Sequence, residues 1–124
     1  MAFDWNGYKT LAISLSGAAD EASKRSAISR GYYFAYHVAL ARARANHYTP
    51  KTRESVHKQL WDHYENSSNL DCRKLALMGK RMKRQRGKAD YDDDFPRLED
   101  NVAAVLSEVH RCESMLRSLP VGAP

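Results

Sequence analysis

The sequence predicts an all-α protein, an up-and-down bundle of four to five helices with short connections. Three observations lead to this fold class. Apolar residues recur at helical spacing in successive segments, the alternation typical of strands is essentially absent, and the long stretch from Asp20 to Asn46 contains no proline. With 124 residues, 43% of them hydrophobic, we expect one domain over 1–119 and a flexible tail over 120–124.

Polar capping residues bound the first two predicted helices. Asp4 is a suitable N-cap for the first helix and Gly17 a suitable stop. A second, long helix is expected from about Asp20 to Asn46, since this segment is rich in alanine and other good helix formers. The apolar residues of the first helix recur at helical spacing: Tyr8, Leu11, Ala12 and Leu15.

Two further helices follow the Thr49-Pro50 break. The third is expected from about Thr52 to Glu65, and the polar loop 66–69 separates it from a fourth that begins near Leu70. Each has an apolar stripe that should face the core: Val56, Leu60 and Tyr64 in the third helix, and Leu75, Met78 and Met82 in the fourth. Trp5 and Trp61 are also expected in the core.

The fifth helix has the clearest pattern. Its apolar residues are spaced alternately by four and three positions, which places them on one continuous seam. We expect Pro96 in its first turn and Pro120 after its end, and we assign the seam to the core. The seam comprises Leu98, Val102, Val105, Val109, Cys112, Leu116 and Leu119.

Composition excludes several classes of protein. No apolar run is long enough to cross a bilayer, and the first residues lack the layout of a secretory signal. Cys72 and Cys112 are too few for a disulfide scaffold and are not spaced as zinc ligands. We therefore expect a cytoplasmic protein with reduced cysteines, no membrane association, no metal and no cofactor.

The net charge of +5 is concentrated in a basic block. Such a block on a helix can follow a phosphate backbone. The alternative is a solvated helix face that surface acids neutralise, among them Asp92, Asp93 and Asp94. These three aspartates are also expected to stabilise the N-terminus of the fifth helix. The block comprises Lys80, Arg81, Lys83, Arg84, Arg86 and Lys88.

One face of the second helix combines an arginine, a phenol and an imidazole. Arg30, Tyr33 and His37 lie at positions i, i+3 and i+7. Arginine binds phosphate with a planar donor fork, tyrosine stacks on an unstacked base, and histidine exchanges protons near neutral pH. The alternative is a buried polar network in which Asp90 or Asp92 pairs with Arg30. The neighbouring strip should pack inward: Ile28, Tyr32, Ala35 and Ala39.

Two segments resemble the HEPN family of small helical domains that bind or cut RNA. The first runs from Arg25 to His37 and fits R-x-A-I-S-R-x-Y-Y-x-x-x-H; the second runs from Arg86 to Tyr91 and ends in A-D-Y. The resemblance covers roughly residues 22–116. It implies a dimer that binds RNA or a nucleotide, often paired with a nucleotidyltransferase as the nuclease-like toxin half of a toxin–antitoxin pair.

The family's metal-independent ribonuclease motif is an arginine followed, after four to six residues, by a histidine. Counting from Arg86 places Tyr91 in the histidine position, and counting from Arg84 places Ala89 there, so neither register supplies an imidazole. His37 is the candidate replacement, because the long helix can bring it towards Arg86. If the protein cuts RNA, we assign phosphate binding to Arg86 and proton exchange to His37.

Tyr91 has two interpretations. In toxin–antitoxin pairs of this family the nucleotidyltransferase attaches AMP to the motif tyrosine, and Arg84, Arg86 and Lys88 could hold the incoming phosphates. Alternatively, Tyr91 caps the core and its hydroxyl bonds to the second helix.

The sequence thus predicts an RNA- or nucleotide-binding cleft. An alternative is a non-catalytic helical scaffold whose motif residues form a structural network, and a third possibility is a basic DNA-binding protein. The predicted cleft residues are Arg30, Tyr33, His37, Arg84, Arg86, Lys88, Asp90 and Tyr91.

Overall fold

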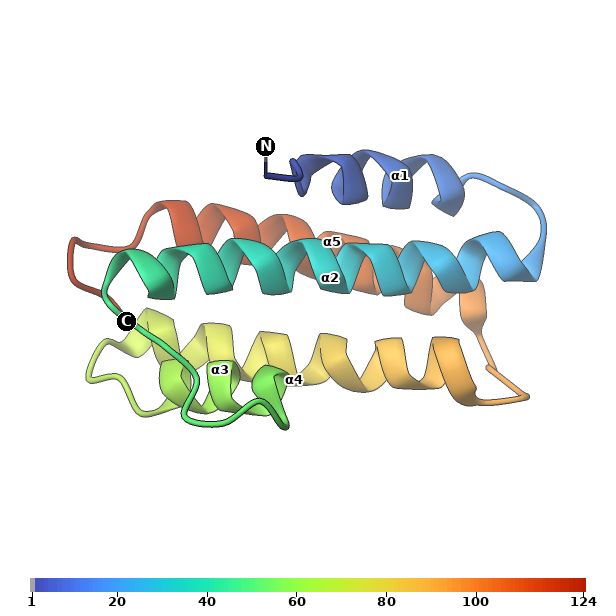
Figure 1. The fold of residues 1–124 in the computed structure, drawn as a ribbon. Helices are drawn as coiled ribbons and strands as arrows, with labels where there is room; N and C mark the ends of the chain where they lie inside the picture. The colour runs from blue at the N-terminus through green and yellow to red at the C-terminus, as the bar shows by residue number, and fades with distance from the viewer. Residues whose placement is uncertain (1) are drawn as a thin grey trace.

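The computed structural model describes residues 2–124 and confirms the all-α prediction, because these residues form five helices and no strand (Figure 1). The helices are α1 (Asn6–Ser16), α2 (Glu21–Ala45), α3 (Val56–Glu65), α4 (Leu70–Tyr91) and α5 (Leu98–Arg117). Within the same residues, no helix is both long enough and apolar enough to cross a membrane.

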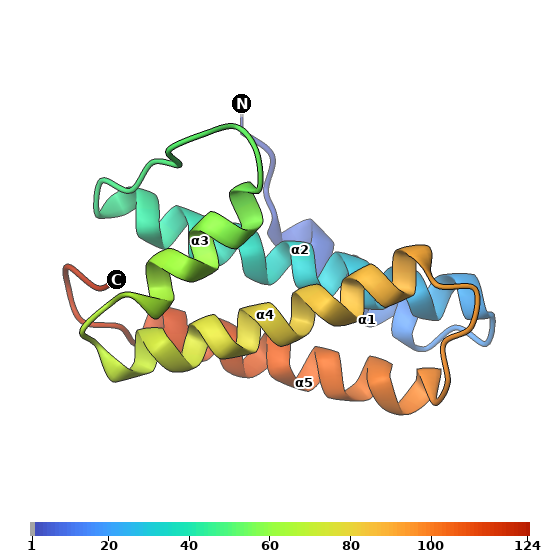
Figure 2. The same cartoon turned by 90° about the horizontal axis from the view of Figure 1, so that it is seen from below.

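The helices pack in three layers. α2 and α5 lie side by side in the middle, α1 covers one side of them, and α4 with α3 covers the other (Figures 1 and 2). The caps explain where the long helices begin. The Asp20 carboxylate accepts a hydrogen bond from Ser23 N at 2.9 Å, and Asn69 Oδ1 accepts one from Cys72 N at 3.0 Å.

The predicted seam of the fifth helix is part of the core. All of its members from the second onward are buried, as are the residues of the inward strip of α2. The buried seam residues are Val102, Val105, Val109, Cys112, Leu116 and Leu119; the buried strip residues are Ile28, Tyr32, Ala35 and Ala39. The seam extends slightly beyond the helix, because α5 ends at Arg117.

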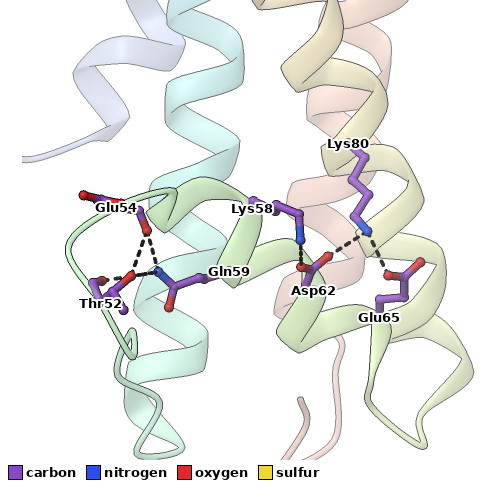
Figure 3. A network of polar contacts seen from close by, with 7 residues as sticks. All are labelled: Thr52, Glu54, Lys58, Gln59, Asp62, Glu65 and Lys80. Carbon is purple, nitrogen blue, oxygen red and sulfur yellow. Dashed lines mark hydrogen bonds and ion pairs between the residues drawn. The ribbon is translucent and has the colours of Figure 1, made fainter.

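Two predicted helix starts are wrong. α3 begins at Val56 rather than Thr52, because the Gln59 side chain holds the preceding residues as a loop. Its Oε1 accepts from Lys51 N at 2.8 Å. Its Nε2 donates to Glu54 O at 2.7 Å, as Figure 3 shows. Pro96 lies before α5 rather than in its first turn, since the chain turns through a left-handed Arg97 with φ of 56°.

The prediction that the aspartates at positions 92–94 stabilise the N-terminus of α5 is wrong. They follow the last turn of α4, where Asp92 is the C-cap. Arg25 explains their position. Its guanidinium donates to the carbonyl oxygens of Ala89, Asp92 and Asp93 at 3.1, 2.6 and 3.0 Å, and so satisfies the carbonyls at the end of α4.

Close approach of α3 to α4 depends on a glycine. Trp61 is completely buried, as predicted, and its ring lies against Gly79 of α4. A Cβ at Gly79 would lie 2.3 Å from Trp61 Cδ2, so only glycine fits this contact without movement.

The tail after Leu119 packs on the bundle. Arg42 Nε and Asn46 Nδ2 both donate to Ala123 O, at 2.8 and 2.9 Å, and Ala123 is buried. The tail expected to be loose is therefore attached to the C-terminal end of α2.

Candidate functional site

One cavity of about 560 Å³ contains most of the predicted cleft residues. It lies between α1, α2 and the last turn of α4. Arg30, Tyr33 and His37 all line it, which agrees with the prediction that they share a face of α2. The full lining is Trp5, Tyr8, Ser29, Arg30, Tyr33, His37, Asp90 and Tyr91.

Arg30 is not paired with an acid, contrary to the structural alternative considered for it. Its guanidinium lies 4.9 Å from the centre of the Tyr8 ring, and it forms no ion pair with any residue from 2 to 124. Asp90 is engaged elsewhere: its Oδ2 accepts from Ser29 Oγ at 3.2 Å and lies 3.6 Å from Arg86 Nη1. The charge of Arg30 is thus held against an aromatic ring at the cavity.

His37 stacks on Trp5. The two ring centres are 3.4 Å apart and the ring planes differ by 7°. Trp5 is therefore half-buried at the cavity wall, and its predicted place in the core is wrong. Burial lowers the pKa of His37, and the nearby positive charge of Arg44 lowers it further. The assignment of His37 as a catalytic residue stays a prediction.

Arg86 has an unusual environment for a guanidinium. Its side chain is only 15% exposed, and it lies 5.8 Å from the ring centre of Tyr32 and 5.6 Å from that of Tyr33. The 3.6 Å separation from Asp90 is too long for a hydrogen bond, and Nε is buried without a partner. Within the described chain, Arg86 therefore has one long ion pair, with Asp90, and no hydrogen bond.

Tyr91 does not cap the core. Its side chain is 78% exposed at the rim of the cavity, whereas Ala89, two residues earlier, is buried. Arg84 and Lys88 lie one helical turn apart on the exposed surface of α4 and do not line the cavity. The structure thus brings Tyr91 to the site and leaves Arg84 and Lys88 beside it.

The basic block is only partly neutralised, and the acids that pair with it are surface acids of α3 and α5 rather than the aspartates at positions 92–94. Lys80 Nζ donates to Asp62 and Glu65 of α3 at 2.9 and 2.8 Å (Figure 3). Arg81 pairs with Glu108 of α5 at 3.1 Å. Of the six cations, Lys83, Arg84 and Lys88 form no ion pair with the residues from 2 to 124, so the C-terminal half of α4 keeps an excess of positive charge.

Sequence reasoning did not assign a role to His57. It lies on α3, where its Nδ1 is 2.7 Å from Tyr32 Oη and its ring stacks on Tyr36 with centres 3.8 Å apart. Burial lowers the pKa of His57 to about 4, helped by the charges of Arg86, Lys83 and His37. His57, and not His37, is thus the histidine whose pKa responds to Arg86.

No group of three or more histidine, cysteine or carboxylate side chains within residues 2–124 is arranged to hold a metal ion. No protein-family model matches this chain, no curated protein is significantly similar to it, and no solved structure matches it.

Proposed function

We propose that this protein is a HEPN-like module that binds single-stranded RNA or a nucleotide at the α2–α4 cavity. One observation carries the proposal: Arg86 places a mostly buried guanidinium beside two tyrosine rings, where its one ion pair, with Asp90 at 3.6 Å, is too long for a hydrogen bond and its Nε has no partner among the described residues. A charged group held in this way costs free energy unless a ligand compensates it.

A phosphate is the ligand that suits this environment. Its oxygens match the planar donor fork of arginine, and such charge-assisted hydrogen bonds are short and strong. Arg86 does not line the 560 Å³ cavity itself, but the ring of Tyr33 lies beside Arg86 and also lines that cavity, where it can stack on a base. The unpaired cations Lys83, Arg84 and Lys88 extend the positive surface along α4 for further phosphates.

Binding of a fluorescein-labelled single-stranded RNA, followed by fluorescence anisotropy at fixed low salt, tests this proposal. Arg86→Ala should weaken binding roughly 10- to 100-fold, because it removes charge-assisted hydrogen bonds. Arg73→Ala is the matched control: it removes an exposed arginine of the same helix that lies beside neither the Tyr32 nor the Tyr33 ring. Equal affinity of the two variants would contradict a phosphate site at Arg86.

RNA cleavage is a separate part of the proposal. The predicted catalytic pair is Arg86 and His37; His37 stacks on Trp5, and the two residues share no hydrogen bond within residues 2–124. Incubating the protein with labelled RNA in EDTA and separating the products on a gel tests the pair. Loss of cleavage in both Arg86→Ala and His37→Ala would support the pair. Cleavage by His37→Ala at the rate of the wild type would exclude His37 from the mechanism.

The exposure of Tyr91 supports the partner proposal. A phenol that is 78% exposed at the cavity rim is accessible to a nucleotidyltransferase that attaches AMP to it. Intact-mass measurement after incubation with ATP and such an enzyme should show one added AMP, absent in Tyr91→Phe.

We also propose that the protein is a homodimer; light scattering coupled to gel filtration should give twice the mass of the chain.

A scaffold without RNA binding is the second candidate function. The observation that favours it is the set of hydrogen bonds joining Trp61, Tyr32 and His57, which supports a structural role for Tyr32 of the first motif. If Arg86 also had only a structural role, Arg86→Ala would lower the free energy of unfolding by roughly 1–3 kcal/mol, and the wild type would not bind the labelled RNA.

A further inference from the structure

A directional chain of hydrogen bonds ends at His57. Trp61 Nε1 can only donate, and it lies 3.1 Å from Tyr32 Oη. The Tyr32 oxygen therefore accepts, and its own proton is free to bind another acceptor. Tyr32 is completely buried, so the acceptor is the His57 Nδ1 atom at 2.7 Å.

This chain fixes the tautomer of His57. Because Nδ1 accepts the phenolic proton, a neutral imidazole must carry its own proton on Nε2. No residue from 2 to 124 forms a hydrogen bond with that atom. The buried side-chain atoms that lack a partner are Tyr48 Oη, Gln85 Oε1 and Arg86 Nε, and His57 Nε2 is not one of them. The Nε2–H group is therefore a free donor that solvent can reach.

The same chain opposes protonation of His57. A proton on Nδ1 would point at a Tyr32 oxygen that already accepts from Trp61, and the buried phenolic proton would then have no acceptor. Burial and the surrounding positive charges act in the same direction on the pKa of His57. The groups that face it are Tyr32, Tyr33, Tyr36 and His37 of α2, and Lys83 and Arg86 of α4.

His57 and Arg86 border the same two tyrosine rings. The Tyr32 ring centre is 5.6 Å from the His57 ring centre and 5.8 Å from the Arg86 guanidinium carbon. The Tyr33 ring centre is 5.7 Å from the His57 ring centre and 5.6 Å from the Arg86 guanidinium carbon. Two unused donor groups, one neutral and one charged, thus come from α3 and α4 to one pair of rings.

We propose that His57 is a neutral hydrogen-bond donor which, together with Arg86, binds a phosphodiester oxygen of the ligand. This inference rests on the proposed function and adds to it the residue that completes the phosphate site. The role differs from that of a general base, because Nε2 already carries its proton and Nδ1 is occupied by the phenol. A neutral imidazole donor of this kind can polarise an oxygen without changing its charge state.

Two substitutions of His57 separate donation from packing. His57→Phe keeps a flat ring against Tyr36 and removes both nitrogens, and it should weaken binding of labelled single-stranded RNA about 5- to 10-fold. His57→Gln keeps a side-chain N–H near the position of Nε2 and should recover most of that loss. Wild-type affinity in His57→Phe, or equal loss in both variants, would overturn the proposal.

The pH dependence gives a readout that packing alone would not change. ¹⁵N NMR of the wild type should show the His57 imidazole in the Nε2–H form and neutral from pH 5.5 to 7.5. In Tyr32→Phe the chain is broken, so the pKa of His57 should rise and RNA binding should tighten as the pH falls through this range. A wild-type His57 that carries its proton on Nδ1, or titrates near pH 6.5, would overturn the proposal.

The outcomes distinguish this inference from the function on which it rests. If the wild type fails to bind RNA, both are wrong. If Arg86→Ala loses binding while His57→Phe keeps it, the RNA-binding proposal stands and only the role of His57 is wrong.

Discussion

Removal of a single hydroxyl group in Tyr32→Phe should reveal how far the buried network stabilises the fold. The Tyr32 side chain is completely buried, and its Oη joins Trp61 Nε1 at 3.1 Å to His57 Nδ1 at 2.7 Å. Burial raises the pKa of Tyr32 well above its usual range, so the phenol stays protonated. The substitution leaves the aromatic ring in place and removes only the two hydrogen bonds.

The expected cost comes mainly from Trp61. Its buried indole N–H would lose its only acceptor, at a cost of about 1–3 kcal/mol. The half-buried His57 contributes less, because water can replace the phenol at Nδ1. We therefore expect a loss of about 2 kcal/mol in the free energy of unfolding. For a chain of 124 residues, unfolding entropy is about 260 cal/mol/K, so the melting temperature should fall by about 8 °C.

Urea unfolding monitored by circular dichroism measures this loss, and Tyr33→Phe is the matched control. Tyr33 is the neighbouring phenol on the same helix, but it is half-buried and its hydroxyl makes no hydrogen bond within the described residues. Its substitution should change the free energy of unfolding by less than about 0.5 kcal/mol. Equal effects of the two substitutions would refute the hydrogen-bond chain.

Three further predictions concern packing and charge away from the site. Gly79→Ala should lower the free energy of unfolding by about 1–3 kcal/mol, because the new Cβ would lie 2.3 Å from a buried tryptophan ring. Unchanged stability in a urea titration would contradict the prediction and show that α3 and α4 can move apart without cost. Although burial raises the pKa of Glu113, hydrogen bonds from Lys9 and Arg117 lower it overall. The ionised Glu113 therefore contributes to the free energy of unfolding above its unfolded-state pKa, and this contribution disappears as the pH falls through the lower pKa of the folded state. Glu113→Gln should therefore cost about 1–2 kcal/mol at pH 7 and little at pH 2.5, as measured by unfolding at both pH values. Burial raises the pKa of Cys112 to about 12, so a thiol reagent at pH 8 should modify it only at the rate of unfolding; rapid labelling of the native protein would contradict this burial.

The bundle could be predicted because periodicity alone decides it. The alternating spacing of the α5 seam leaves one way to bury those side chains, and the long proline-free segment has no internal stop before Asn46. The start of α3 could not be predicted in the same way. Residues from Thr52 onward have acceptable helix propensity, and the loop is held by the side chain of Gln59 from within the helix.

The candidate site was predicted in part. Helical geometry placed Arg30, Tyr33 and His37 on one face without knowledge of the packing. The role of His57 depends on how α3 crosses α2, and a single histidine on a short helix gives no signal of that contact. The same limit explains Trp5, since an aromatic residue near the N-terminus reads as core until its stacking partner is known.

Several residues of the first motif have structural roles that sequence resemblance does not reveal. Arg25 binds the carbonyls at the end of α4, and Ser29 donates to Asp90 of that helix. Both contacts fix the position of the last turn of α4, which carries Asp90 and Tyr91. A motif of this kind can therefore be retained for geometry even where one of its residues never touches a ligand.

α3 is attached to the bundle through α4 and a small patch of α2, so the proposed ligand site would link local unfolding of α3 to ligand occupancy. A phosphate that needs donors from both α3 and α4 can bind only while α3 is docked. Ligand at about 100 times its dissociation constant would then oppose undocking by about 2.7 kcal/mol. Amide hydrogens of α3, including those far from His57, would exchange about 100-fold more slowly in the complex if undocking is the opening that exposes them. The rate at which α3 separates would then set an upper limit on the lifetime of the complex.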